Sequence, residues 1–442
     1  MKNSPLLLLL LLLAACSGNQ RVTPPTASPL LYCATVKKLN DVVLYNNFPP
    51  MIAARNYAYA QIAAYECVAA GDARFRSLSG QIPHLPALPR PAAGPVDYPL
   101  AALLSFVKVG NSVTFPEGVL MDYYGELIDR ARNDGLPQAT IDRTVTWSDS
   151  VAAAVLRWSK KDNYAQTRTA TRFHITSQEG RWTPTPPAYM QGLEPSWGAI
   201  RPLALDSAGQ FAPPAPPPFN LKDTASEFYR QLREVRETVA RLTPEQQHIA
   251  EFFDDNPFKL EVAGHVMYSK KKFSPAGHWM NIVGIAAEKA GADFSTTVAA
   301  YTATSIALFD GFIACWHSKY RYASIRPETV INKALDPEWR PYIQTPPFPS
   351  YISGHSVISA AAAETMTHFF GDRLRFTDTS LNEFGIKART FASFRAAAQE
   401  ASWSRLYGGI HFRSDLEEGN KVGTRIGAHL VQRLRFRKEE GK

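Results

Sequence analysis

The chain has 442 residues, of which 45% are hydrophobic and 20% are charged. This composition allows a large buried core and excludes a disordered protein. The formal net charge is +8, but the basic residues are scattered and accompany no nucleic-acid-binding motif, so we expect no nucleic acid as a partner.

The N-terminus has the pattern of an export signal. Lys2 precedes an apolar run at Leu6–Leu13, which is much shorter than the ~20 residues that a membrane-spanning helix needs. Two alanines and Cys16 follow, and this pattern resembles the lipobox of bacterial lipoproteins. We therefore expect a signal peptide at residues 1–15, a lipidated Cys16, a flexible tether over residues 16–30, and a lipid-anchored protein on a membrane surface of the bacterial cell envelope, in the periplasm or at the outer membrane. An ordinary secretory signal cleaved nearby is the alternative.

Residues 31–442 are predicted to form one helical domain, with the ligand-binding half at about residues 226–436. Apolar residues recur at steps of three and four, proline-rich breaks separate the periodic stretches, and no long run alternates with a period of two. The predicted fold class is therefore all-α, a helical bundle. We expect helices over Leu30–Tyr45, Ile52–Ala70, Leu100–Val107, Val119–Arg132, Ala139–Ser159, Gln246–Phe253, Trp279–Ala290, Phe294–Trp316, Val357–Phe370, Thr390–Leu406 and Leu416–Leu434.

Thr243 marks the start of one of these helices. A threonine side chain can cap a helix, and proline is tolerated at the first helical position, where Pro244 stands. Gln246 follows Thr243 by three residues, the spacing of a reciprocal capping box. We therefore predict that the helix begins directly after Thr243.

Besides Cys16, the chain has three cysteines. Cys33 and Cys67 lie on two predicted helices and can pair as a disulfide in an oxidising compartment, with two buried free thiols as the alternative. Cys315 lies in an apolar helical stretch. No spacing of cysteine and histidine indicates a zinc site.

The first of three polar clusters near the C-terminus contains Lys319 and Arg326. These residues are seven apart, which is two helical turns, so on a helix they would share a face. Pro327 disfavours a helical conformation for the residue before it, so Arg326 is expected where the helix gives way to a loop. Taken alone, such a pair also fits a solvated helix face.

The second cluster is Ser353-Gly354-His355, directly before an alanine-rich helix. A hydroxyl, a glycine amide and an imidazole at a helix N-terminus suit a tetrahedral anion, because the amides point outward and the helix dipole favours negative charge. The alternative is that Ser353 caps the helix and His355 is merely exposed.

The third cluster contains Arg405, His411 and Asp415. A carboxylate close to an imidazole can fix the tautomer of the ring and raise its basicity, as a nucleophilic or metal-binding nitrogen requires. Asp415 can also cap the helix that follows, and the two roles are compatible.

In this order, the clusters resemble the shared motif of type 2 phosphatidate phosphatases and vanadium-dependent haloperoxidases: Lys-x6-Arg-Pro, Ser-Gly-His and Ser-Arg-x5-His-x3-Asp. Every position is matched, and the Pro-Ser of the middle block is present as Pro349-Ser350, three residues before Gly354. The resemblance implies the helical bundle of vanadium chloroperoxidases and acid phosphatases, with one pocket for vanadate or phosphate.

The resemblance also implies roles for single residues. His411 binds vanadium axially in the peroxidases or attacks phosphorus in the phosphatases, and Asp415 orients it. His355 is the acid/base, and Lys319 polarises bound peroxide. The residues that it implies for oxyanion binding are Lys319, Arg326, Ser353, Gly354, His355, Arg405 and His411.

In looser form the resemblance extends from about Thr243 to Gly427 and includes an acidic stretch after Glu251. It implies that Asp255 forms an ion pair with Arg405, and Asp254 is the other candidate for this partner.

Three features favour vanadate over phosphate. The sequence lacks the membrane spans of the lipid phosphatases, the block before His355 resembles the haloperoxidase version, and Trp316 and Phe348 match apolar residues on the halide side of the peroxidase pocket. We therefore expect oxidation of iodide or bromide by hydrogen peroxide with vanadate as cofactor, as in lipoprotein-type iodoperoxidases. His317 is a departure, because such relatives often have an acidic residue there.

Two alternatives of other kinds stay open. One is a periplasmic acid phosphatase that hydrolyses a phosphoester through a phospho-His411 intermediate. The other is an oxyanion-binding lipoprotein without catalytic activity, although a binding protein needs neither His355 nor His411 in acid and nucleophile positions.

Overall fold

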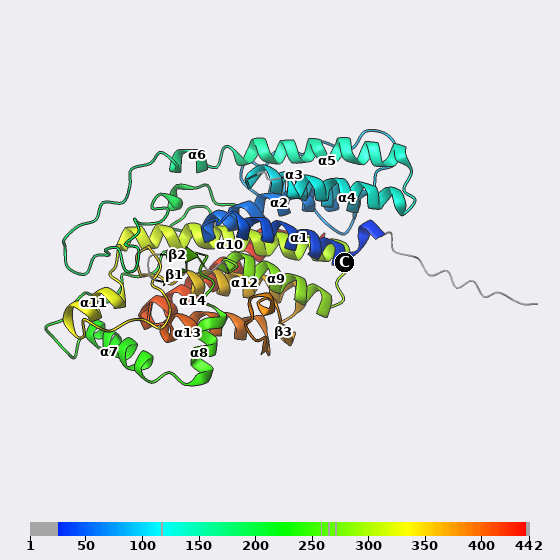
Figure 1. Cartoon of the computed structure of the whole chain (residues 1–442). Helices are drawn as coiled ribbons and strands as arrows, with labels where there is room; N and C mark the ends of the chain where they lie inside the picture. The colour runs from blue at the N-terminus through cyan, green and yellow to red at the C-terminus, as the bar shows by residue number, and fades with distance from the viewer. Residues whose placement is uncertain (1–24, 116–117, 258, 264–265, 270–271, 439–442) are drawn as a thin grey trace, which may run out of the picture.

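Helix α10 (Phe294–Tyr322) lies at the centre of the molecule and organises the rest (Figure 1). The side chain of Asp293 accepts a hydrogen bond from the amide of Thr296 and so starts the helix. Helices α1, α2, α9, α12 and α14 pack around it. Its length and hydropathy would suit a membrane span, but its apolar window is wholly buried inside the protein, as is typical of a core helix.

The computed structural model describes residues 25–115, 118–257, 259–263, 266–269 and 272–438. The predicted signal peptide and Cys16 lie outside the described residues. The predicted all-α class is confirmed, because helices dominate and strands form only two short hairpins. The other elements are η1 (Pro25–Ala27), α1 (Pro29–Tyr45), α2 (Pro50–Gly71), α3 (Tyr98–Val113), α4 (Val119–Asn133), α5 (Gln138–Ser159), α6 (Tyr164–Thr167), η2 (Trp197–Ala199), α7 (Glu227–Ala240), α8 (Pro244–Phe252), β1 (Leu260–Ala263), β2 (Val266–Ser269), α9 (Pro275–Lys289), α11 (Pro327–Ala334), α12 (Gly354–Phe370), β3 (Phe376–Asp378), η3 (Asn382–Phe384), β4 (Arg389–Phe391), α13 (Phe394–Tyr407) and α14 (Arg413–Arg433).

The N-terminal helices α2 to α5 form a layer on one side of α10 (Figure 1). A buried ion pair fastens this layer, with Arg55 Nε 2.7 Å from Asp162 Oδ2. The hydroxyl of Tyr59 donates to the same carboxylate oxygen at 2.8 Å. Removing one partner of such a pair costs about 3–5 kcal/mol, because the other charge stays buried.

Helices α12 and α14 form the other side and approach each other very closely. The contact is lined by glycines of α14 that recur every four residues, Gly419, Gly423 and Gly427. A Cβ atom on Gly423 would lie 2.1 Å from the carbonyl oxygen of Val357, so only glycine fits there. The two helices therefore meet backbone to backbone, and their N-termini lie together at the site described below.

Most of the predicted helices are found with ends shifted by a few residues. Helix α8 begins after Thr243, and both hydrogen bonds of the predicted capping box between Thr243 and Gln246 are formed. The helix expected over Thr390–Leu406 is wrong at its start, because β4 occupies that stretch and Ser393 caps α13. Helices α7 and α11 and the two hairpins were not predicted.

Of the two possibilities for Cys33 and Cys67, a disulfide or two buried free thiols, the structure has free thiols, with Cys67 buried and Cys33 only partly buried. Cys67 is buried with its sulfur 3.5 Å from the hydroxyl of Ser105, and Cys33 lies beside Tyr301 instead. The two thiols therefore face different neighbours, and the alternative of free cysteines holds.

The described structure begins inside the segment predicted as a tether, with η1 and the first turn of α1.

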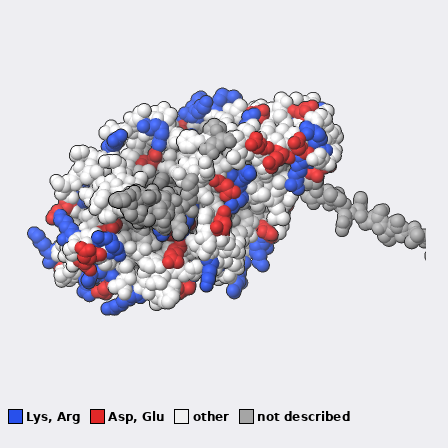
Figure 2. Space-filling view, in the orientation of Figure 1, with Lys and Arg blue, Asp and Glu red and all other residues white. Residues whose placement is uncertain are grey.

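On the face shown in Figure 2, Lys and Arg side chains alternate with Asp and Glu and form no continuous basic stripe.

Two glycine substitutions test the contact between α12 and α14. Gly423→Ala should destabilise the fold by about 1–3 kcal/mol, because the added methyl overlaps the backbone of α12. Gly125→Ala in α4 is the matched control, since nothing lies within 4 Å of the added atom. It should stabilise the protein by about 0.5–1 kcal/mol through helix propensity. Urea unfolding of both variants measures this, and equal signs would contradict the backbone contact.

Candidate active site

Three buried cations, Lys319, Arg326 and Arg405, lie at one pocket, and each is at most 2% exposed. Arg405 is part of the pocket lining, whereas Lys319 and Arg326 stand behind the lining residue Phe348. Within the described part of the chain, none of the three forms an ion pair with a carboxylate. Backbone carbonyl oxygens accept their hydrogen bonds instead, those of Pro349 and Ser350 for Lys319, Phe348 and Ile410 for Arg326, and Phe253 and Asp254 for Arg405. A buried cation without a counter-charge is strongly unfavourable, so this arrangement calls for an anionic ligand.

The end of α10 places Lys319 and Arg326. The helix stops at Ala323, whose left-handed conformation (φ 45°) turns the chain away. Pro327 then opens α11, and the residue before it, Arg326, is extended with φ −87° and ψ 150°. Arg326 thus lies between two helices, where its side chain can be directed at a ligand. This is the position expected from the proline that follows it.

His411 stands just before α14, and its ring is fixed on both sides. Nδ1 lies 2.7 Å from Oδ2 of Asp415, and because a carboxylate only accepts hydrogen bonds, Nδ1 holds the proton. Nε2 is then unprotonated and lies 3.1 Å from Nη1 of Arg326. Burial and then the charges of Arg326 and Lys319 lower the pKa of His411, so Nε2 stays available as a nucleophile or metal ligand.

Ser350, to which the motif assigned no role, completes this arrangement. Its hydroxyl donates to Oδ2 of Asp415 at 2.5 Å and lies 3.4 Å from Nδ1 of His411. Asp415 also accepts from the amide of Phe412, so it caps α14 while it orients His411. The available signal was the Pro-Ser pair of the motif, which carries this serine.

Ser353, Gly354 and His355 form the start of α12. The hydroxyl of Ser353 accepts a hydrogen bond from the amide of Ser356. Ser353 therefore caps α12, which was the alternative to a role in anion binding. His355 is not merely exposed, since its side chain is only 15% accessible and lines the pocket. Burial and the nearby Arg405 lower the pKa of His355 to about 4, so its imidazole is neutral at neutral pH.

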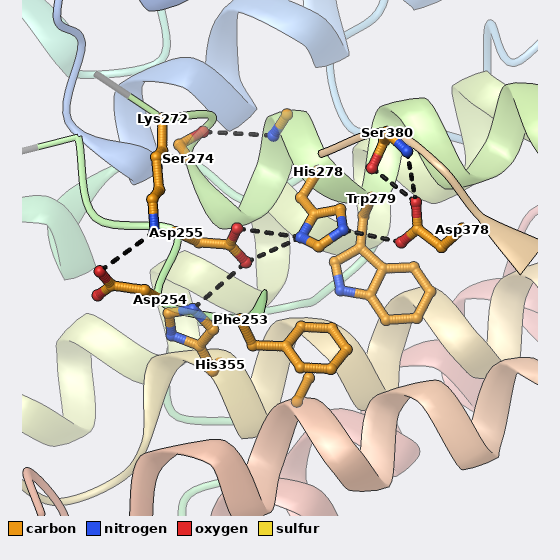
Figure 3. A network of polar contacts seen from close by, with 12 residues as sticks. Phe253, Asp254, Asp255, Lys272, Ser274, His278, Trp279, His355, Asp378 and Ser380 are labelled. Atoms are coloured by element: carbon orange, nitrogen blue, oxygen red, sulfur yellow. Dashed lines mark hydrogen bonds and ion pairs between the residues drawn. The ribbon is translucent and has the colours of Figure 1, made fainter. Parts of the chain in front are cut away.

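The prediction that Asp255 or Asp254 pairs with Arg405 is wrong. Asp255 is bound by His278, whose Nδ1 lies 3.0 Å from both carboxylate oxygens (Figure 3). Asp254 lies near two lysines, at 3.5 Å from Lys259 and 3.6 Å from Lys272. The physical reason is tertiary, because α9 brings His278 to the acidic loop after α8.

Most of the predicted site residues line a single pocket with an empty volume of about 580 Å³. The rings of Trp316 and Phe348 form an apolar wall, with centroids 4.9 Å apart. Behind Phe348 stand Lys319 and Arg326, with Nζ and Cζ 5.0 and 5.1 Å from the centroid of its ring. The pocket lining includes the predicted residues Trp316, Phe348, Gly354, His355, Arg405 and His411.

His317, which departs from the expected acidic residue, does not line this pocket. It is directed at the loop that covers α10, where Gly198 packs on its backbone and Gly209 on its ring. Burial and the charge of Arg321 lower the pKa of His317. Any effect of this residue on the pocket is therefore indirect.

The donors around the pocket fit a tetrahedral oxyanion. Among the described residues, the buried side-chain atoms without a hydrogen-bond partner include Nη2 of Arg326 and Nε2 of His355, and also Oδ1 of Asp254, which lines the same pocket. Buried donors without a partner are rare in folded proteins and need an explanation. An anion with several acceptor oxygens supplies both the missing acceptors and the missing negative charge.

Comparisons with known proteins agree with this geometry. The chain matches the family model described as the VCPO second helical-bundle domain over residues 299–439, the segment that holds Lys319, His355 and His411. The crystal structure of a bacterial vanadium-dependent iodoperoxidase has 40% sequence identity and a TM-score of 0.89, and the match covers 95% of this chain and 100% of that chain. This chain belongs to the vanadium-dependent haloperoxidase family.

More distant haloperoxidases share the fold. The holo and apo structures of a bacterial vanadium-dependent chloroperoxidase have 17% identity and TM-scores of 0.65 and 0.66. The matches cover 87% and 88% of this chain and 92% and 94% of those chains. No curated protein sequence matches the chain significantly.

Lys319→Met tests the unpaired charges. Burial lowers the pKa of Lys319, so the ammonium destabilises the protein without ligand at pH values below its ordinary pKa of 10.5. We expect the variant to unfold at the same or a higher temperature than the wild type without ligand. The difference should grow as the pH falls from 10.5 toward 7 and should be fully present below pH 7, because burial lowers the pKa of Lys319 to about 7. Phosphate or vanadate at about 100 times its dissociation constant should stabilise the wild type by about 2.7 kcal/mol and the variant by less. Equal stabilisation of both proteins would contradict a role of Lys319 in anion binding.

Proposed function

We propose that this haloperoxidase oxidises iodide or bromide with hydrogen peroxide, using vanadate held at His411. The observation that carries the proposal is the set of three buried cations without carboxylate partners near His411, whose Nε2 is unprotonated and lies 3.1 Å from Nη1 of Arg326. Family membership supports the vanadium-dependent chemistry. The preference for iodide or bromide rests on the sequence resemblance and on the similarity to an iodoperoxidase.

The residues that would hold vanadate follow from the pocket. Lys319, Arg326 and Arg405 would balance the negative charge of its oxygens, and His411 would bind it through Nε2. The helix start at Gly354 adds backbone amides and a favourable dipole. The chemistry that vanadate supplies when bound is activation of hydrogen peroxide toward halide.

His355 acts as the acid/base in this proposal. Its ring is neutral at neutral pH because burial lowers its pKa, so it can accept a proton from hydrogen peroxide that enters the pocket. The carboxylate of Asp255, 3.7 Å from Nε2, would stabilise the imidazolium that forms. Asp415, held by Ser350, keeps the proton of the neutral His411 ring on Nδ1, so that Nε2 stays unprotonated.

Trp316 and Phe348 would form the halide side of the pocket. An anion that enters between these rings loses part of its water, and the ammonium of Lys319 behind Phe348 compensates for this loss. Large and weakly hydrated halides lose water most easily, which favours iodide and bromide over chloride.

We also propose that Cys16 is lipidated and anchors the enzyme to a membrane surface of the cell envelope. The support is the small-small-Cys pattern after the leucine run. Labelled fatty acid should be incorporated into the wild type expressed in a bacterium and not into Cys16→Ser.

The direct assay combines protein with vanadate, hydrogen peroxide and each halide in turn, and in parallel with a phosphomonoester without vanadate. We expect halide oxidation that disappears when vanadate is removed by a chelator. Phosphoester hydrolysis that vanadate inhibits, without halide oxidation, would show an acid phosphatase instead and refute the proposal.

His355→Ala should lower kcat for halide oxidation by about 10²–10⁴-fold, the usual contribution of an acid/base group. The matched control is His368→Ala, an exposed histidine on the same helix that is absent from the pocket lining. Steady-state rates for the two variants decide the matter. Equal activity in both would remove His355 from the mechanism.

Phe348→Ala tests the halide wall. We expect a higher KM for iodide, because the halide position becomes open to water, and a smaller change in the KM for hydrogen peroxide. Initial rates with each substrate varied in turn measure the two constants. An equal rise in both KM values would contradict a wall specific to the halide.

A further inference from the structure

Asp255 and Arg405 both line the pocket and interact electrostatically, and yet they form no ion pair. Asp255 has a left-handed backbone with φ 40°, which is uncommon outside glycine. Its two oxygens meet Nδ1 of His278 at 3.0 Å each. The acceptors that bind Arg405 are all neutral: the backbone carbonyls of Phe253 and Asp254 and the hydroxyl of Ser404.

His278 has a second carboxylate on its other side. Nε2 lies 2.8 Å from Oδ2 of Asp378, which belongs to β3 (Figure 3). Because carboxylates only accept hydrogen bonds, both ring nitrogens must carry protons, so the geometry requires an imidazolium. Burial alone would lower the pKa of His278, but the two carboxylates outweigh it and raise this pKa to about 10.

This chain of charges is buried. His278 is 1% exposed and Asp378 is fully buried. The amide and hydroxyl of Ser380 donate to Oδ1 of Asp378 at 3.0 and 2.6 Å. The rings of Phe252 and Phe253 pack on the imidazole, with centroids 5.4 and 5.6 Å away.

The position of Asp255 determines how much of the positive charge of Arg405 faces the ligand. The groups around Asp255 are His278 on one side and His355 and Arg405 on the pocket side. A carboxylate free to turn toward Arg405 would form a bidentate ion pair with it. Such a pair would cancel the charge that an oxyanion needs, and would leave His355 without its acidic neighbour.

We propose that His278 and Asp378 are positioning residues that hold the Asp255 carboxylate toward His355 and away from Arg405, which keeps the Arg405 charge available for the oxyanion. In identifying that oxyanion as vanadate, the inference rests on the proposed function. The positioning itself concerns any tetrahedral anion, and inorganic phosphate can therefore report on it independently.

The test measures dissociation constants by calorimetry for orthovanadate and for inorganic phosphate. The hydrogen-bonded pair His278–Asp378 acts as a clamp on Asp255, and His278→Leu removes this clamp with little change in side-chain volume. We expect the variant to bind both anions about 10- to 100-fold more weakly, as for other groups that orient a binding shell. Asp378→Asn is a milder variant and should also weaken binding. Removal of a negative charge would by simple electrostatics tighten it, so the sign distinguishes the two explanations.

A second substitution separates positioning from a general loss of structure. Asp255→Ala combined with His278→Leu should bind both anions more tightly than His278→Leu alone, because no carboxylate is left to pair with Arg405. The control is Asp162→Asn, which disturbs a buried ion pair with Arg55 far from the pocket lining. It should leave both constants unchanged.

The outcomes are decisive in either direction. Wild-type affinity in both Asp378→Asn and His278→Leu would overturn the proposal, and so would a double variant that binds no better than His278→Leu. If His278→Leu fails to fold, the sign of the change in Asp378→Asn alone decides. An enzyme without halide oxidation would refute the proposed function, while the phosphate constants would still test the clamp.

Discussion

Three cations buried without counter-charge are the constraint on which the rest of the site depends. Backbone carbonyls hold Lys319, Arg326 and Arg405 in place, and these neutral dipoles orient the charges without cancelling them. The protein without ligand therefore carries an unfavourable electrostatic energy, which an oxyanion relieves. Stability and ligand binding are thus linked, and the remaining fold must supply enough stability to tolerate the empty state. The buried Arg55–Asp162 pair and the glycine contact of α14 are two sources of it.

The close approach of α12 and α14 places the groups that face these cations. Because Gly423 has no side chain, the two helices touch through their backbones, and the amide of Ser353 donates to the carbonyl of Asp415 at 3.0 Å. His355 on one helix and His411 before the other thereby face one pocket. Groups fixed on the starts of two packed helices are held more precisely than groups on a free loop, as a pre-organised site requires.

The sequence predicted what depends on local chemistry. The capping box at Thr243 and the extended Arg326 before its proline follow from neighbouring residues, and the motif brought the pocket residues together. The same reasoning missed α7, although Phe228 and Leu232 are apolar at helical spacing, because the helix is mostly polar. It could not predict the partner of Asp255, since the clamp joins His278 to Asp378 over 100 residues through a hairpin with no clear sequence signal.

The carboxylates of the site explain why the cations stay unpaired and why three histidines differ. Asp255 and Asp415 are bound by imidazoles, a hydroxyl or an amide, and Asp254 lies near two lysines, so none of these three carboxylates pairs with a guanidinium. The number of carboxylates in contact with a ring then sets its protonation. His278 lies between two and is a cation, whereas His411 contacts one through Nδ1 and keeps a free Nε2. His355 has a carboxylate only at 3.7 Å, too far for a direct hydrogen bond, so its ring is neutral and free to take up a proton during the reaction.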